Sequence, residues 1–460
     1  MIMRVSLGRP TARVLLGVAA NAVGKAWVLL IQLASVPILV SSWGASGYGV
    51  WLMLTAIPTY VALSDLGFGT AGGVNMLRRV AAGDLSGALC AFQSVWLFIS
   101  LISVAILGLA SGLWLVARDF SGLAGWHDER LPATALLLVT YSLVVLQMNV
   151  MNMGFRSIGH YAQGTFLLDI VSPIEQATVL AAASFGGSYL ACASLMLIVR
   201  VIGFIFYYTT LRRAAGWIRF GWTEARASEV RSLAKPAIAA LSLPISSALS
   251  IQGTVFFVGL AVSPAAAAVL GTIRMMARVP LQVVGLLTRA ALPEITVAEA
   301  HKDKLYVDRL VYLNLTVFLL VTIPSAAALI VAGDRLLFWI ARGQMHASTI
   351  LFVALTVNMI LSTLWGTVGS FLLAINQQHR FAAVYAATSA VTAGLVYLAA
   401  SKFGIEAAAI ALLPMDVIVA FTVLHHWFRG YRRYDFAEHM RVTWRLARAV
   451  SVKLAPGQSS

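Results

Sequence analysis

Long apolar segments with almost no charge are the feature that most constrains this chain. A helix needs about 20 predominantly apolar residues to cross the hydrocarbon core of a bilayer. Twelve such segments follow one another, at roughly 13–41, 47–76, 86–116, 132–153, 162–183, 186–211, 236–262, 265–294, 309–332, 348–372, 381–400 and 405–427. Because 60% of the 460 residues are hydrophobic and only 11% are charged, no water-soluble fold could cover this apolar surface. The sequence therefore predicts an all-α integral membrane protein with about 12 transmembrane helices.

The basic residues are distributed unevenly between the two sides of this arrangement. If the N-terminus is cytoplasmic, 24 of the 33 lysines and arginines lie on the inner side and 5 lie in outer loops. The other four lie inside predicted spans: Lys25, Arg200, Arg274 and Arg278. The positive-inside rule then predicts a multi-pass protein with both termini in the cytoplasm. Topology and contact with anionic membrane lipids account for the formal net charge of +15, so no nucleic-acid partner is expected.

The stretch LSDLGFGTAGGV, residues 63–74, contains a GxGxxG pattern at Gly67, Gly69 and Gly72. A dinucleotide-binding fingerprint needs a strand, a tight turn and a helix, with an acidic residue about 20 positions further on. Here the flanks are apolar and predict one continuous helix over 47–76, so we reject nucleotide binding. Small residues allow membrane helices to approach closely, and we expect the glycines to have this role.

The two halves of the chain match at an offset near 218 residues. Gly83–Asp84 matches Lys302–Asp303, and the segment SFGG at 184–187 matches KFGI at 402–405. The segment RSIGHY at 156–161 matches INQQHR at 375–380, which aligns His160 with His379. These matches predict a duplication of six helices; the alternative is a helical bundle whose loop lengths coincide.

A six-helix duplication predicts two lobes that point the same way, related by a pseudo-two-fold axis along the membrane normal. We expect an N-terminal lobe at 1–211, a cytoplasmic inter-lobe loop at 212–235, a C-terminal lobe at 236–427 and a basic cytoplasmic tail at 428–460. Parallel repeats of this kind build transporters whose substrate site lies between the halves.

Residues 41–84, SSWGASGYGVWLMLTAIPTYVALSDLGFGTAGGVNMLRRVAAGD, carry a specific resemblance. They resemble the early part of polysaccharide transport proteins of the O-antigen and exopolysaccharide flippase type (Wzx-like). These proteins belong to the multidrug/oligosaccharidyl-lipid/polysaccharide exporter superfamily. The segments GFRSIGHY, LAINQQHR and FGIEAAAIA resemble later loops of the same family, so the likeness covers the whole chain.

The resemblance implies a transporter of the bacterial cytoplasmic (inner) membrane. Such a protein moves an undecaprenyl-diphosphate-linked oligosaccharide from the inner to the outer leaflet by alternating access. The lipid-linked oligosaccharide is a repeat unit of a lipopolysaccharide O-antigen or an exopolysaccharide, and polysaccharide polymerase machinery is a further expected partner. The motifs do not identify the sugar.

Four polar residues inside the spans are the predicted substrate-binding site: Lys25, Arg274, Arg278 and Gln252. Placing an ionisable group in the middle of a span costs about 2.5–3.5 kcal/mol of insertion free energy, so we expect each such residue to have a structural or functional role. Arg274 and Arg278 are four residues apart and share one helix face. Because a guanidinium binds phosphate bidentately, the two arginines and Lys25 suit the diphosphate of the implied substrate. Gln252 supplies a neutral hydrogen bond to a sugar.

Four acidic residues lie away from the ends of the predicted spans: Asp65, Asp169, Glu175 and Asp416. We predict that Asp65, Glu175 and Asp169 form an ion-coupling set that binds H⁺ or Na⁺ during transport. Asp65 is expected in a helix interior, facing a cavity or paired with Lys25. The alternative for each acid is a static pair with an intramembrane cation, and the sequence leaves this choice open.

Two other functions compete with this interpretation. A cation-coupled drug exporter of the related multidrug and toxin extrusion type would share the fold, but its cavity should be acidic, whereas the deep residues here are basic. A membrane-bound glycan polymerase or ligase would need a substantial outer loop with catalytic residues, and the outer loops are short. Cys90 and Cys192 lie in apolar segments, so we expect no disulfide framework and no metal site. The sequence shows no convincing nucleophile, metal cluster or nucleotide-binding loop, so we expect no cofactor and no enzymatic activity.

Overall fold

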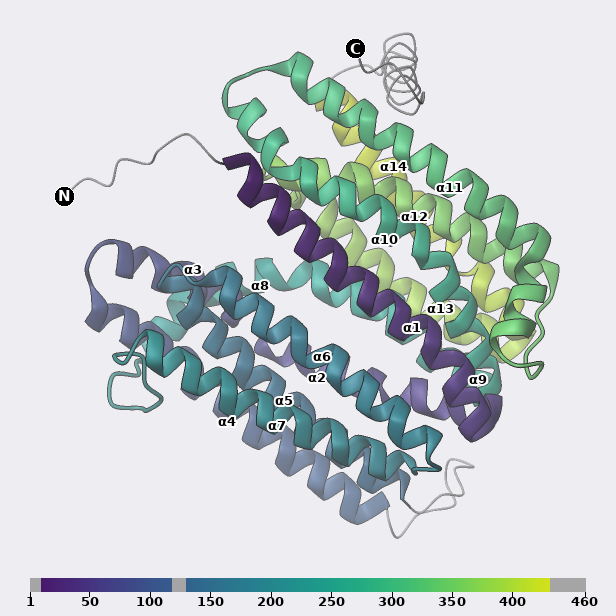
Figure 1. The fold of residues 1–460 in the computed structure, drawn as a ribbon, viewed down its shortest axis with the longest axis horizontal. Coiled ribbons are helices and arrows are strands. Elements are labelled where there is room, and N and C mark those ends of the chain that lie inside the picture. Colours follow the sequence, from purple (N-terminus) through teal and green to yellow (C-terminus); the bar gives the residue numbers. More distant parts are fainter. Residues whose placement is uncertain (1–9, 118–129, 431–460) are drawn as a thin grey trace, which may run out of the picture. The chain divides into compact units, whose positions relative to one another are not determined.

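The computed structural model describes residues 10–117 and 130–430, with the side chains of residues 10–29 outside this description. The described residues form helices and no strands (Figure 1). The helices are α1 (Pro10–Leu54), α2 (Ala56–Ala62), η1 (Leu63–Asp65), α3 (Phe68–Ala81), α4 (Leu85–Ala117), α5 (Leu131–Ser157), α6 (Tyr161–Ser184), α7 (Tyr189–Ala214), α8 (Ala227–Ala248), η2 (Leu249–Gly253), α9 (Thr254–Ala261), α10 (Pro264–Ala300), α11 (Lys304–Ile340), α12 (Thr349–Ala374), α13 (His379–Ile410) and α14 (Leu413–Gly430).

The number of membrane-crossing helices agrees with the prediction. Ten described segments are long and apolar enough to cross a bilayer, and two of them have 52 and 51 residues, enough for two crossings each. Gly44 (φ 73°) and Gly404 (φ 83°) interrupt these two segments with left-handed backbone that favours glycine. The described part of the chain therefore confirms an all-α membrane protein with about 12 spans.

The chain divides into two compact units. The first, called here the α2–α9 unit, comprises Ala26–Val269 and Ile340–Met345. Among the described residues, the second, the α11–α14 unit, comprises 10–25, Leu270–Trp339 and 346–430. These units do not follow the repeat, because α8 and α9 belong with the helices of the first half. The predicted lobes at 1–211 and 236–427 are defined by sequence and stay a prediction.

Within the α2–α9 unit, α5 lies at the centre of the packing and contacts α2, α3, α4, α6 and α7. Its buried side chains include Leu138, Leu146, Met151 and Phe155. In the α11–α14 unit, α12 and α13 both pack against α14 (Figure 1). Helices buried on several sides need apolar residues around their whole circumference, and this is the composition that the sequence shows.

Polar contacts join turns that the topology places on the same side of the membrane. The Trp43 indole donates a hydrogen bond to the Gly187 carbonyl (3.0 Å), and its ring lies 4.7 Å from that of Tyr189. At the opposite ends of the helices, Arg79 forms a bidentate pair with Glu229 at 2.7 and 2.8 Å. Each contact links turns predicted on one side, so the structure is consistent with the predicted loop order.

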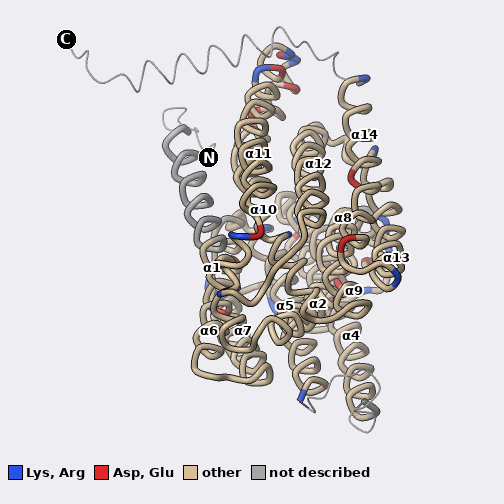
Figure 2. The backbone as a smooth tube through the Cα atoms, turned by 90° about the vertical axis from the view of Figure 1, so that its right-hand side faces the viewer, with Lys and Arg blue, Asp and Glu red and all other residues tan. Residues whose placement is uncertain are grey.

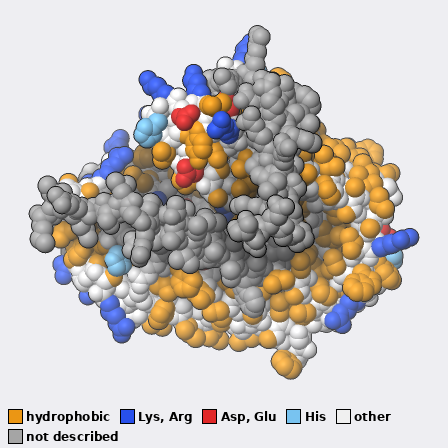
Figure 3. Space-filling model, turned by 45° about the horizontal axis from the view of Figure 1, so that its top comes forward, with side chains coloured by type: hydrophobic (Ala, Val, Ile, Leu, Met, Phe, Trp, Pro, Cys, Tyr) orange, Lys and Arg blue, Asp and Glu red, His pale blue; other side chains and the backbone are white. Residues whose placement is uncertain are grey.

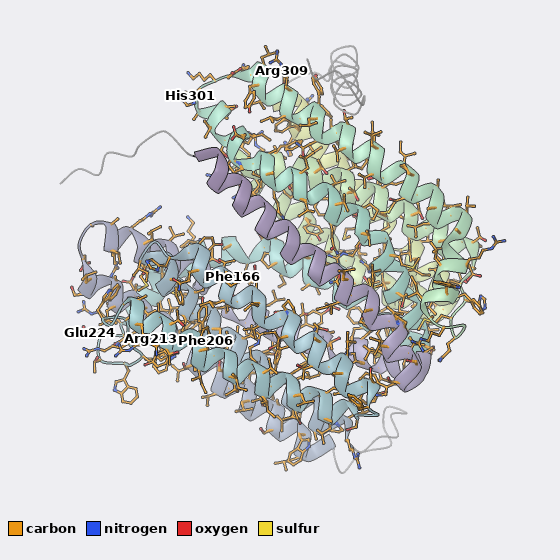
Figure 4. All side chains as sticks on the ribbon, in the orientation of Figure 1. Phe166, Phe206, Arg213, Glu224, His301 and Arg309 are labelled. Carbon is orange, nitrogen blue, oxygen red and sulfur yellow. The ribbon has the colours of Figure 1, made fainter. Side chains whose placement is uncertain are left out.

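The inter-lobe segment is shorter than predicted, because α8 begins at Ala227 within the expected loop 212–235. The remaining connection packs on α4 through Gln93, which donates to the Arg219 carbonyl (3.2 Å) and accepts from the Glu224 amide (2.9 Å). Figure 4 shows Arg213 and Glu224 beside this connection. It is therefore a docked part of the α2–α9 unit.

The local geometry of two matching turns supports the duplication. Gly83 and Lys302 both have left-handed backbone, with φ 79° and 57°. The next residue in each turn caps the following helix: Asp84 accepts from the Gly87 amide (2.8 Å), and Asp303 accepts from the Tyr306 amide (3.1 Å). The hydrogen bonds from the Gly87 amide and the Ser86 hydroxyl lower the pKa of Asp84.

Two further turns refine the alignment of the halves. Gly186 and Gly404 match at the predicted offset, with φ 79° and 83°. In the turns predicted to match at 156–161 and 375–380, the residues with positive φ are Gly159 and Asn376. Aligning these two residues shifts the predicted register between the halves by two residues. The predicted pairing of His160 with His379 is therefore wrong, and His160 corresponds to Gln377, whose amide makes the same turn hydrogen bond.

Charged residues are sparse along the helices. Long stretches of α4, α11 and α12 carry no charge, and charged residues gather towards helix ends (Figure 2). Hydrophobic side chains cover much of the face in Figure 3. Phe166 on α6 and Phe206 on α7 are among the exposed apolar residues (Figure 4). A surface of this kind suits contact with lipid.

Candidate functional site

Two predicted substrate-binding arginines lie on one face of α10. Arg274 is 8% exposed, and it interacts electrostatically with Arg278 one turn further along the helix. Both guanidinium groups also interact with Tyr385 on α13. The structure confirms the predicted shared face. The prediction was possible because it depends only on the spacing of two residues within one helix.

A buried carboxylate on α14 lies beside these arginines. Asp416 is 1% exposed and interacts electrostatically with Arg274. Its two oxygens accept hydrogen bonds from α12, one from the Asn358 amide and one from the Trp365 indole at 2.8 Å. The Trp365 ring in turn lies 4.9 Å from the ring of Tyr385. Four helices of the α11–α14 unit therefore contribute to one buried polar cluster.

The charges of this cluster are unequal. The cluster contains two guanidinium groups, which stay protonated in proteins, and one carboxylate, which interacts with Arg274. Of the acidic residues that the structure describes in the α11–α14 unit, Asp416 alone is buried. The cluster, made of Arg274, Arg278, Asn358, Trp365, Tyr385 and Asp416, thus carries an excess of positive charge that suits an anion.

The other two predicted substrate-binding residues lie elsewhere in the chain. Gln252 is in η2, a five-residue π-helical segment of the α2–α9 unit. Such segments often occur at functional sites. Lys25 is in α1, and its side chain lies outside the described residues. The convergence of Lys25 and Gln252 on the arginines stays a prediction.

Glu175, a predicted ion-coupling residue, is engaged in a buried ion pair. Its Oε2 lies 2.5 Å from Arg200 Nη2 and accepts a hydrogen bond from the Tyr141 hydroxyl at 2.9 Å. Arg200 also lies over the Tyr141 ring, 5.1 Å from its centroid. Glu175 and Arg200 are 1% and 4% exposed. This geometry favours the static alternative, in which the pair joins α6 to α7.

Asp65 lies in a turn, and its predicted place in a helix interior is wrong. The apolar segment 47–76 breaks at Thr55 and again after η1, where Leu66 and Gly67 have φ 50° and 78°. Asp65 Oδ1 accepts a hydrogen bond from the Gly67 amide at 2.7 Å. The carboxylate therefore stabilises the turn that precedes α3.

The glycines of this segment have the predicted packing role. A Cβ atom on Gly67 would overlap the carbonyl of Ala237 on α8, and one on Gly72 would lie 2.6 Å from Met153 on α5. The described residues contain no strand, so the GxGxxG pattern has no βαβ context.

In the part of the chain that the structure describes, no interaction assigns a role to the remaining residues singled out from the sequence. Asp169 is exposed on α6. Cys90 and Cys192 are buried and free. Among the described residues, no three histidine, cysteine or acidic side chains gather in a group that could hold a metal ion.

The sequence did not identify the partners of Asp416. Asn358 and Trp365 are seven residues apart, which places them on one face of α12, but this spacing does not reveal the helix that the face contacts. The pairing of Glu175 with Arg200 is likewise a contact between helices, 25 residues apart in sequence.

Comparison with solved structures identifies the fold. The lipid II flippase MurJ in an inward closed conformation superposes with a TM-score of 0.66 at 13% identity, over 95% of this chain and 93% of that chain. An inward-facing multidrug resistance transporter of the MATE family, in the MOP superfamily, gives a TM-score of 0.64 at 12% identity, over 94% and 96% of the two chains.

A third similar structure is a MOP superfamily transporter from Pyrococcus furiosus, with a TM-score of 0.60 at 13% identity over 91% of this chain and 93% of that chain. For that protein, a reverse polarity of the binding pocket is taken to suggest a different function. No protein-family model and no curated protein sequence matches this chain. The chain has the fold of the MOP superfamily transporters. Its structural neighbours are transporters rather than enzymes.

Proposed function

We propose that this protein is a flippase for an undecaprenyl-diphosphate-linked oligosaccharide, a repeat unit of an O-antigen or exopolysaccharide. It moves this substrate from the inner to the outer leaflet of the bacterial cytoplasmic membrane by alternating access. The resemblance of residues 41–84 to polysaccharide transport proteins supports the substrate class. The structural similarity to a lipid II flippase supports the proposal that this fold can accommodate a lipid-linked substrate.

The observation that carries the proposal is the pair of guanidinium groups on α10. Arg274 and Arg278 are adjacent like charges deep in a helical unit, and the single charge of Asp416 beside Arg274 cannot balance both. A further anion at this pair would lower the cost of keeping both groups charged. A diphosphate offers several anionic oxygens, enough for two forked donors, and each arginine binds one phosphate group bidentately. The neutral donors Asn358 and Trp365 hydrogen-bond the carboxylate of Asp416.

The competing function is a cation-coupled drug exporter. MATE transporters share the fold at a similar TM-score, so the fold alone does not separate the two functions. The charge of the site favours the flippase, because a site for cationic drugs needs an excess of negative charge. An excess of arginine over carboxylate repels such compounds.

Deletion of the gene in its own bacterium tests the proposal. We expect lipid-linked oligosaccharide to accumulate in the inner leaflet and the surface glycan to be lost. Plasmid-borne wild-type protein should restore display, and so should Arg309→Ala, which removes an exposed arginine of the same unit. The double variant Arg274→Ala/Arg278→Ala should not. Normal glycan display in the deletion strain, together with greater sensitivity to cationic drugs, would establish the competing function.

A further inference from the structure

Asp416 has no role in the function proposed above, yet it is the most completely enclosed charge of the arginine cluster. It is held between α12 and Arg274 of α10. Burying a carboxylate is costly unless it is paired and hydrogen-bonded. Both conditions are met here, but the pairing depends on Arg274, which is also a proposed ligand of the substrate.

Substrate binding changes the charge that surrounds Asp416. Without substrate, the carboxylate lies beside the positive charge of Arg274, which stabilises its ionised form, and Arg278 lies next to Arg274. A diphosphate that links two organic groups adds two negative charges to the same arginines. Asp416 then lies in a cluster with an excess of negative charge, and its neutral form is favoured.

We propose that Asp416 is a proton-binding site that takes up one proton when the substrate's diphosphate binds Arg274 and Arg278, and releases it when the substrate leaves. This inference rests on the function proposed above. The proton comes from the solution, one O–H bond forms at a carboxylate oxygen, and no bond of the substrate changes. Transport would thereby be coupled to proton movement through the α11–α14 unit.

The hydrogen-bond partners indicate which oxygen takes the proton. Trp365 is a donor only, so the oxygen that it contacts, Oδ1, must remain an acceptor. Asn358, which contacts Oδ2, has both a donor and an acceptor on its amide. Rotation of that amide would turn its carbonyl oxygen towards a protonated Oδ2. The site therefore satisfies both the charged and the neutral form of Asp416.

Few other titratable groups face this carboxylate. From α10 comes Arg274, with Arg278 beside it, and from α13 comes Tyr385, which interacts with both arginines. The α12 contacts, Asn358 and Trp365, do not titrate. The other buried carboxylate of a described span, Glu175, is paired with its own Arg200 in the α2–α9 unit.

Isothermal titration of the full-length protein in detergent tests the proposal. The probe is a farnesyl-diphosphate-linked monosaccharide, whose two phosphates are both diesters and do not titrate near neutral pH. Repeating the titration in buffers of different ionisation enthalpy gives the number of protons taken up per bound molecule. We expect uptake approaching one proton for the wild type and for Asp303→Asn, which removes an exposed helix cap of the same unit. Asp416→Asn should bind the probe without proton uptake.

A second variant covers the case in which Asp416→Asn does not fold. Trp365→Phe keeps an aromatic ring against Tyr385 but removes a hydrogen bond that stabilises the charged carboxylate. The pH midpoint of proton uptake should therefore rise, by about one unit. Binding without uptake in the wild type, or uptake retained in Asp416→Asn, or an unchanged midpoint in Trp365→Phe, would overturn the inference. Absence of binding to the wild type would instead overturn the proposed function, and the inference with it.

Discussion

At the scale of single residues, the carboxylates of Asp65, Glu175 and Asp416 have three kinds of partner. Asp65 accepts from a backbone amide, Glu175 is paired with an arginine, and Asp416 accepts from two neutral side chains beside an arginine. Only the last of these lies where a substrate anion would compete for the cation. The type of a residue and its depth in the membrane are therefore not enough to predict which acidic residue changes protonation during transport.

The Glu175–Arg200 pair gives the first prediction. Glu175→Gln leaves a buried guanidinium without a counter-charge and should destabilise the protein by about 3 kcal/mol or more. Glu175→Gln/Arg200→Met removes both charges and should recover most of that loss. Thermal unfolding in detergent measures both effects. The double variant should also transport as the wild type does, whereas loss of transport in a stable double variant would favour ion coupling by Glu175.

Asp65 gives the second prediction. Asp65→Asn retains an oxygen that can accept from the Gly67 amide, so stability and transport should change little. Asp65→Ala removes the acceptor and should lower the free energy of unfolding by about 1 kcal/mol. Transport assays on stable variants separate the two roles: an inactive Asp65→Asn would show that the negative charge, rather than the turn, is required.

At the scale of elements, left-handed residues decide where the long apolar segments break. Gly44 and Gly404 divide segments of about fifty residues into two spans each, and Leu66 and Gly67 divide the segment 47–76. The break at Gly67 also allows the turn to contact the Ala237 carbonyl of α8. It has no counterpart in the second half, where α10 is continuous.

Two glycines with the same backbone angle provide a matched pair for the third prediction. Gly67 and Gly83 have φ 78° and 79°, but only at Gly67 would an added Cβ meet another helix. Gly83→Ala should cost about 1 kcal/mol, the strain of a left-handed alanine. Gly67→Ala should cost at least twice as much, because the Cβ also overlaps the backbone of α8. Equal unfolding temperatures for the two variants would contradict the role given to this contact.

Sequence reasoning reached the features that depend on one helix or one turn. The spans follow from apolar length, the shared face of Arg274 and Arg278 follows from their spacing, and the match between the turns at Asp84 and Asp303 follows from the repeat. The break at Gly67 was missed because an apolar run gives no sign of a left-handed residue within it. Contacts between helices, such as those of Asp416, depend on which helix faces pack together. The pairing of these faces cannot be predicted from a single sequence.

At the scale of the whole molecule, the helix count and the distribution of basic residues define a topology. Turns predicted on one side contact each other within the units, as Trp43 and Gly187 do, and as Arg79 and Glu229 do. The positive-inside rule assigns the Arg79 side to the cytoplasm. This assignment, with both termini cytoplasmic, is a prediction from sequence.

Reporter fusions give the fourth prediction. Fusions after Arg79, within the connection at 215–226 and after Arg433 should report a cytoplasmic location. A fusion at Gly343, in the turn after α11, should report the opposite side. Activity of alkaline phosphatase and fluorescence of a cytoplasm-specific protein, measured on each fusion, give independent readings. A cytoplasmic signal from Gly343 would contradict the arrangement of six spans per half.

The central claim is that Arg274 and Arg278 bind the diphosphate of a lipid-linked oligosaccharide during its transfer between leaflets. The most direct measurement is translocation of a fluorescent prenyl-diphosphate oligosaccharide by purified protein in proteoliposomes. Because a charge-assisted hydrogen bond contributes about 1.5–3 kcal/mol, Arg274→Ala/Arg278→Ala should slow transfer about tenfold or more at low substrate. The corresponding double lysine variant should recover part of the rate, since it keeps the charge but not the fork, and Arg309→Ala should match the wild type. Wild-type transfer by a correctly folded Arg274→Ala/Arg278→Ala protein would contradict the account.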